Sequence, residues 1–171
     1  KQTLAFGSSQ SGRFLRNFLY LGFNADEKNR MVFAAVLAHI AGASRIDVNN
    51  RWATPTTLGQ FNATSFPFAD VSLRDPATGV EEGAVDNARA RGFAPKIFYT
   101  NTGVEYWGGG RSAALIHTTP DGKKDLNLPD NERVYLLAGS QHGPGRFRPA
   151  DARNGQQQEN PTEYWYVMRA L

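Results

Sequence analysis

The chain of 171 residues contains no cysteine. This absence excludes disulfide bonds, thiolate metal sites and a cysteine nucleophile, and it leaves the cellular compartment open. The three histidines have no metal-ligand spacing relative to Asp47, Asp70 or Asp75. We therefore expect neither a metal ion nor another cofactor.

Long apolar runs and clusters of one charge are also missing. No apolar run approaches the ~20 residues of a membrane-spanning helix. The net charge is only +3, with acidic and basic residues interspersed, so a nucleic-acid partner is not expected. The basic side chains are expected on a solvated surface: Arg13, Arg16, Lys123, Lys124, Arg146 and Arg148. The length and the 40% hydrophobic content predict one globular domain, residues 1–171, with a core of its own.

A turn rich in glycine and serine lies near the start of the chain. Residues 4–6 before it are typical of the end of a buried strand, and apolar residues recur at helical spacing over 14–21. Ser9 has a glycine two positions before it and the small residue Ser11 two positions after it, as in a nucleophile elbow, where small residues allow a turn tight enough to expose the hydroxyl. We predict Ser9 as a nucleophile and the backbone N–H of Gln10 as an oxyanion donor.

Two other roles of this turn remain open. A turn of this kind also binds anions at a helix N-terminus, and Ser11 is equally suited to cap the helix. Neither G-x-G-x-x-G nor G-x-x-x-x-G-K-[ST] fits residues 7–14, so the nucleotide-binding patterns are not met.

A serine nucleophile needs a histidine and a carboxylate, which in α/β-hydrolases follow in the order serine, acid, histidine after successive strands. Glu105 comes shortly after the apolar segment 96–100, and His142 lies in a glycine-rich loop after the apolar segment 133–138. Taken singly, His142 is equally typical of a solvent-exposed loop, and Glu105 is equally typical of a surface charge. Their order and their places after strands predict a Ser9, Glu105 and His142 triad.

The chain alternates between predicted strands and helices. Strands are expected at 2–6, 34–40, 96–101 and 133–138, and helices at 11–23, 84–91, 111–117 and 161–171. This alternation predicts an α/β fold with a mostly parallel sheet flanked by helices. Residues 31–40 are apolar with little alternation, as in a strand covered on both faces.

Residues 43–83 have no helical or strand periodicity. An irregular stretch of about 40 residues is uncommon in a compact domain unless it has a function. We favour a lid or substrate-pocket insertion in which Trp52 contacts substrate. The alternative is a packed surface excursion whose aromatic side chains anchor it to the core.

The other two histidines have less defined roles. His39 lies near the end of the strand expected beside the Ser9 strand. We favour a buried, hydrogen-bonded ring there and keep substrate contact as the alternative. His117 is expected to be structural.

Three segments resemble a bacterial family of α/β-hydrolase domain proteins, presumed serine esterases: "GSSQSGRFLRNFLYLGFNADE", which contains a G-x-S-Q-S-G-R elbow, "NTGVEYWGGGRSAALIHTTPDG" and "LLAGSQHGPG". The resemblance extends over most of the chain and is weakest over residues 43–83. It implies the hydrolase fold, with Ser9 and His142 as triad members, and it implies Glu105 less directly.

The two ends of the chain suggest part of a larger fold. α/β-hydrolases have several strands before the elbow strand, whereas here the elbow strand comes first, and the final helix lacks a C-cap signal. We expect the C-terminal part of an α/β-hydrolase, associated with the N-terminal half of the same enzyme or with a second copy of the chain.

Together these patterns predict a serine hydrolase that acts on small-molecule carboxylic esters through an acyl-enzyme. An ester is favoured over an amide because the sequence has no peptide-binding device. The alternative is a hydrolase-like domain used for binding or scaffolding without turnover.

Overall fold

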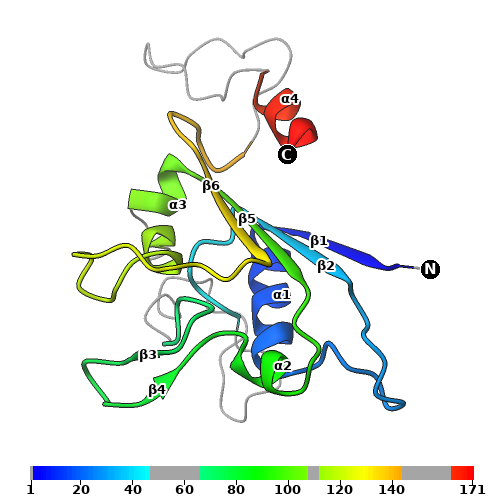
Figure 1. Ribbon diagram of the computed structural model, residues 1–171. Coiled ribbons are helices and arrows are strands. Elements are labelled where there is room, and N and C mark those ends of the chain that lie inside the picture. The colour runs from blue at the N-terminus through cyan, green and yellow to red at the C-terminus, as the bar shows by residue number, and fades with distance from the viewer. Residues whose placement is uncertain (1, 47–65, 108–111, 144–162) are drawn as a thin grey trace, which may run out of the picture.

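The computed structural model describes residues 2–46, 66–107, 112–143 and 163–171. Four parallel strands form its main sheet: β1 (Leu4–Ser8), β2 (Ala35–His39), β5 (Lys96–Thr102) and β6 (Glu132–Leu137). Their order across the sheet is β1-β2-β5-β6 (Figure 1). Because the strands are parallel, the residues that follow each of them emerge at one edge of the sheet.

Helices flank this sheet, as expected for the α/β class. The helices of the described residues are α1 (Gln10–Tyr20), α2 (Asp86–Ala90), α3 (Gly103–Trp107), the 3₁₀ turn η2 (Ala113–Ile116) and α4 (Glu163–Ala170). α1 packs against β1 and β2 and lies beside α2 (Figure 1). α3 follows β5 directly and contacts it, so this short helix sits at the carboxyl edge of the sheet.

All four predicted strands are present, and each begins and ends within two residues of its predicted bounds. The largest difference concerns the first strand, predicted at 2–6, which continues to Ser8. The physical reason is the parallel pairing with β2, which runs from Leu4 opposite Ala35 to Ser8 opposite His39.

The helices predicted at 11–23, 84–91 and 111–117 are longer than the observed ones. The helix predicted at 11–23 ends at Tyr20 because Gly22 adopts a φ of 76°, a left-handed conformation that commonly ends helices. The helix predicted at 111–117 is a single 3₁₀ turn over Ala113–Ile116. The helix predicted at 84–91 corresponds to the shorter α2, and the one predicted at 161–171 corresponds to α4, which ends at Ala170.

A small antiparallel ribbon, β3 (Leu73–Arg74) and β4 (Glu81–Glu82), lies within residues 43–83, where the sequence has no strand periodicity. The connection between its strands is closed by Asp75, whose backbone N–H donates to the Val80 carbonyl oxygen at 2.7 Å. The Asp75 carboxylate accepts a hydrogen bond from the Thr78 hydroxyl. Strands of two residues are too short to produce a recognisable period in the sequence.

The core lies between α1 and the face of the sheet that it covers. Its side chains include Leu15, Leu19, Val36, Ile97 and Ile116, all at most 7% exposed. Leu15 and Leu19 lie one turn apart on α1, and Val36 and Ile97 are register partners on β2 and β5, so both pairs face the same layer.

The expectation that Arg13 and Arg16 are solvated is wrong, because they are only 6% and 2% exposed. Nη2 of Arg16 donates hydrogen bonds to the carbonyl oxygens of Ala43 and Phe68, at 3.2 and 2.5 Å. Its guanidinium also lies over the Tyr99 ring, 4.8 Å from the centroid. The buried cation is thus held by acceptors from distant parts of the chain.

Two buried carboxyl groups accompany Arg16. The Tyr99 hydroxyl lies 2.9 and 2.8 Å from the two carboxylate oxygens of Asp70. Glu132, at the start of β6, is 1% exposed, and its carboxylate has no hydrogen-bond partner among the described residues. Burial, together with the nearby charge of Asp70, raises the pKa of Glu132 to about 8, although Arg16 opposes the shift.

We predict that Glu132→Gln stabilises the protein more at pH 8 than at pH 5. Between the ordinary carboxyl pKa of 4.5 and the folded-state pKa of about 8, the Glu132 carboxyl group takes up a proton on folding. The wild type therefore loses stability as the pH rises through this window, whereas glutamine does not titrate. Thermal unfolding of both proteins at the two pH values measures the difference. An equal gap in Tm at pH 5 and pH 8 would contradict the assignment.

Candidate active site

The turn between β1 and α1 holds Ser9 in an uncommon backbone conformation, with φ 55° and ψ −116°. Its N–H donates to the His39 carbonyl oxygen at 2.8 Å, and its carbonyl oxygen accepts the N–H of Arg13 at 3.0 Å. Such strained residues persist only where the surroundings fix them, and they cluster at functional sites. Ser9 therefore occupies a tight turn that is held on both sides.

The capping role considered for Ser11 is wrong, because Ser11 lies inside α1 and Ser9 takes the N-cap position without a side-chain capping bond. Gln10 is the first residue of α1, and an N–H at that position has no partner within the helix. The backbone N–H next to Ser9 is thus suited by position to meet an anionic oxygen.

Gly7 makes this turn possible. A Cβ at position 7 would lie 2.5 Å from the Ser11 carbonyl oxygen and 2.8 Å from the Gly12 nitrogen, both backbone atoms. Any side chain there would push α1 away from the end of β1, which explains in physical terms the small residue required two positions before Ser9.

The structure brings together the three residues predicted as a triad. Ser9 Oγ lies 2.9 Å from His142 Nε2, and His142 Nδ1 lies 2.6 Å from Glu105 Oε1. The Ser9 and His142 strands are the outer two of the four, three strand spacings or about 14 Å apart. The segment after β6 must therefore reach back across the ends of β5 and β2 to place the imidazole beside Ser9.

Glu105 lies in α3, directly after β5, and is fully buried. Its Oε2 accepts hydrogen bonds from the backbone N–H of Thr102, at 3.1 Å, and from the Thr102 hydroxyl. Burial alone would raise the pKa of Glu105, but the hydrogen bonds from Thr102 and His142 outweigh it and lower the pKa. Glu105 is therefore an anion at neutral pH, despite its burial.

An ionised carboxylate only accepts hydrogen bonds, so the proton of a neutral His142 ring must be on Nδ1, facing Glu105. Nε2 then carries a lone pair and accepts the hydrogen bond of the Ser9 hydroxyl. This arrangement is able to remove a proton from Ser9 and to hold the resulting imidazolium beside a negative charge. Thr102 is not among the predicted site residues, and its only signal in the sequence is a hydroxyl group three positions before the acid.

His39 is buried, as we favoured, with 2% of its surface exposed. Its Nδ1 lies 2.8 Å from Thr100 Oγ1, and its ring stacks on that of Phe6 with centroids 6.3 Å apart. Burial lowers the pKa of His39, against the influence of Glu105, so the ring is neutral at pH 7. The contact of His39 with Ser9 runs through the backbone carbonyl, which no side-chain pattern reveals.

Trp52 is outside the described residues, as is the range 47–65 of the lid predicted at 43–83. In the described part of that segment, the side chain of Phe68 packs against the core. The carbonyl oxygen of Phe68 accepts a hydrogen bond from Arg16 of α1.

No group of three or more histidine, aspartate and glutamate side chains in the described ranges is arranged to hold a metal ion. Over the same ranges, no helix has the length and apolar character needed to cross a membrane.

A family model described as an alpha/beta hydrolase domain matches residues 1–168. Searches of the curated proteins and of the solved structures found no match. The matched range includes all of the main sheet and each residue of the Ser9, His142 and Glu105 cluster.

We predict that Gly7→Ala destabilises the protein by roughly 1–3 kcal/mol, as overpacking of rigid contacts does. The added methyl group would meet backbone atoms of α1, which are unable to move aside as a flexible side chain does. Urea denaturation measures the change. Gly143→Ala is the matched control, since its Cβ would meet nothing within 4 Å among the described residues. Equal stability of the two variants would contradict the close approach at Gly7.

Proposed function

This chain belongs to the alpha/beta hydrolase domain family, and on that premise we propose that it is a serine hydrolase acting on carboxylic esters. The observation that carries the proposal is the hydrogen-bonded series Glu105, His142 and Ser9, with distances of 2.6 and 2.9 Å. The residues come from different strand ends, and the serine sits in a tight strand-to-helix turn, as this chemistry requires.

In the proposed reaction, Ser9 Oγ attacks the ester carbonyl carbon while His142 Nε2 takes the hydroxyl proton. The carbonyl oxygen becomes an oxyanion that accepts a hydrogen bond from the backbone N–H of Gln10. Collapse of this intermediate breaks the bond to the alkoxy group, which leaves as an alcohol with the proton from His142. Water, deprotonated by His142, then releases the acid from Ser9 and restores the starting state.

Glu105 has two roles in this proposal. It keeps the Nδ1 proton of His142 in place, so that Nε2 is free to act as a base, and its negative charge stabilises the imidazolium that forms. The two hydrogen bonds from Thr102 support both roles, because they hold the carboxylate in position and favour its ionised form. Thr102 is therefore proposed as a positioning residue.

The neutral, buried ring of His39 is proposed as a support for the turn. Its hydrogen bond with Thr100 ties the end of β2 to β5, while its carbonyl oxygen holds the Ser9 N–H. Esters are favoured over amides because no device for binding an extended peptide is evident in the sequence.

Labelling with a fluorophosphonate probe tests the proposal. We expect the intact protein to gain one covalent adduct on Ser9, located by mass spectrometry of the modified peptide. Ser9→Ala should not react, and His142→Ala should react at least 100-fold more slowly, because the hydroxyl has lost its base. Ser11→Ala is the matched control and should react normally.

A well-folded intact protein that remains unlabelled would contradict the proposal. That result would favour the alternative, in which a hydrolase-like fold serves binding or scaffolding without turnover.

We predict that Glu105→Gln lowers kcat for an activated ester such as p-nitrophenyl acetate by a factor on the order of 10²–10⁴. The glutamine amide neither stabilises the imidazolium nor enforces the Nδ1–H tautomer. Glu132→Gln is the matched control, since Glu132 is also buried but lies at the other end of the sheet. It should retain near-normal turnover, and similar losses in both variants would contradict the role of Glu105.

A further inference from the structure

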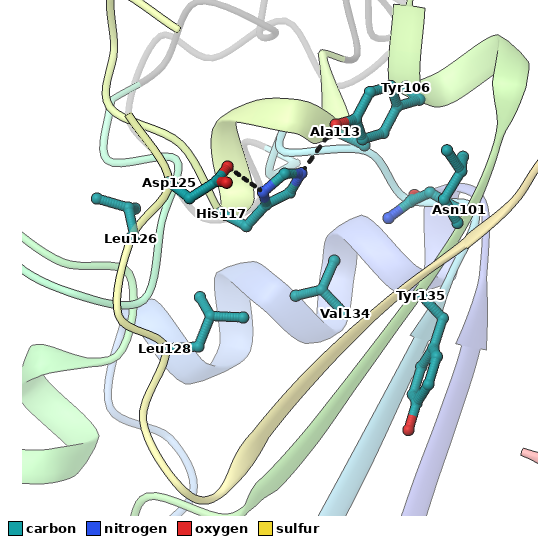
Figure 2. A pocket seen from close by; sticks show the side chains of 10 residues that line it. Asn101, Tyr106, Ala113, His117, Asp125, Leu126, Leu128, Val134 and Tyr135 are labelled. Atoms are coloured by element: carbon teal, nitrogen blue, oxygen red, sulfur yellow. Dashed lines mark hydrogen bonds and ion pairs between the residues drawn. The ribbon is translucent and has the colours of Figure 1, made fainter. Parts of the chain in front are cut away.

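A second feature of the molecule lies outside the proposed reaction. A pocket of about 350 Å³ opens between β6 and the segment that runs from η2 to Leu128 (Figure 2). Ser9, Glu105 and His142 are not among the described residues that line it. Its volume falls within the range typical of small-molecule sites, which is roughly 300–1,000 Å³.

The walls of this pocket are mainly apolar. Ala113, Leu126, Leu128 and Val134 line it from three different segments (Figure 2). A molecule with an apolar body would release water from these side chains on binding, which favours association. Leu126 and Leu128 are half-buried residues of a connecting segment, so their side chains are replaceable without cutting into the core.

One edge of the pocket is polar, but its polar groups already bind one another. The Tyr106 hydroxyl lies 3.0 Å from His117 Nε2, and the two rings stack with centroids 5.7 Å apart. On its other side, His117 Nδ1 lies 3.5 Å from Asp125 Oδ1. The Asp125 side chain is 87% exposed, so an anion entering from solvent would meet a carboxylate.

The inner end of the pocket has a hydrogen-bond donor without a partner. Asn101 is 2% exposed, and its Oδ1 accepts the backbone N–H of Gly42 at 2.9 Å, which fixes the orientation of the amide. Its Nδ2 points toward the space between His117 and Val134 (Figure 2) and has no hydrogen-bond partner among the described residues. A buried N–H without an acceptor is unfavourable, and a ligand oxygen would remove that cost.

From these contacts we propose that the pocket binds a small uncharged molecule with an apolar body and a carbonyl oxygen that accepts a hydrogen bond from Asn101 Nδ2. An anion is disfavoured by Asp125 at the polar edge. A cation is disfavoured because the unpartnered group at the inner end is a donor. The apolar walls select the body of the ligand, and the amide selects its oxygen.

The location of this site gives it a connection to the candidate active site. Asn101 directly precedes Thr102, and Tyr106 directly follows Glu105. A ligand in the pocket therefore contacts Asn101 and Tyr106, which are the chain neighbours of Thr102 and of the proposed catalytic carboxylate Glu105. Binding itself does not require Ser9, so the proposal does not depend on the hydrolase chemistry.

N,N-dimethylbenzamide is a suitable probe, because it has an aromatic body, a strong carbonyl acceptor and no ester bond. Isobutylbenzene is its matched control, with a similar shape and no oxygen. Both are titrated into the intact protein and into Ser9→Ala, and the methyl resonances of Ala113, Val134, Leu126 and Leu128 are followed by NMR. We expect saturable shifts with the amide in both proteins and at least tenfold weaker binding of the hydrocarbon.

Leu128→Trp and, independently, Leu126→Trp place an indole in the pocket and should weaken binding of the amide at least tenfold. The comparison of the two probes needs no variant, so it tests the role of Asn101 even if a substituted protein fails to fold. Equal affinity for the amide and the hydrocarbon would overturn the role of Asn101. Loss of binding in Ser9→Ala, or unchanged binding in both tryptophan variants, would overturn the separate site.

Discussion

The hydrogen bond from the Ser9 N–H to the His39 carbonyl oxygen joins the candidate active site to the sheet. It continues the parallel pairing of β1 and β2 by one residue beyond the strand end. The Ile40 N–H continues the pairing of β2 and β5 in the same way, by donating to the Thr100 carbonyl oxygen at 2.7 Å. These backbone hydrogen bonds join the carboxyl ends of three strands. The placement of side chains along that edge depends on them, because loops alone position groups less exactly.

Glu105 and Glu132 show how differently one residue type behaves at equal burial. Both are at most 1% exposed. Thr102 and His142 supply hydrogen bonds to the first, and its pKa is lowered, whereas the second has no such partner among the described residues and its pKa is raised to about 8. Burial therefore does not decide the charge of a carboxyl group here. The donors around it do, and they explain why an anion is maintained beside His142 at neutral pH.

The sequence predicted the features that depend on local patterns. The period of apolar residues predicted the four strands and α1, and the spacing around Ser9, together with the strand ends before Glu105 and His142, predicted which side chains meet. Prediction from the sequence failed where a side chain finds its hydrogen-bond partners on distant segments. Arg16 is a typical surface residue until the carbonyl oxygens of Ala43 and Phe68 are folded against it. In the same way, nothing local to Asn101 predicts that its amide faces a pocket, because the pocket walls come from segments distant in the sequence.

The separation of 133 residues between Ser9 and His142 bears on the order in which this molecule is made. Chains emerge from the ribosome N-terminus first, so Ser9 is synthesised well before its proposed base, and β6 must join the sheet before the two meet. Contacts so distant in sequence form late in folding, because the chain between them must first be ordered. During synthesis the serine is therefore an ordinary hydroxyl group, and under the proposed function a truncated or misfolded chain would lack the His142 contact that activates Ser9.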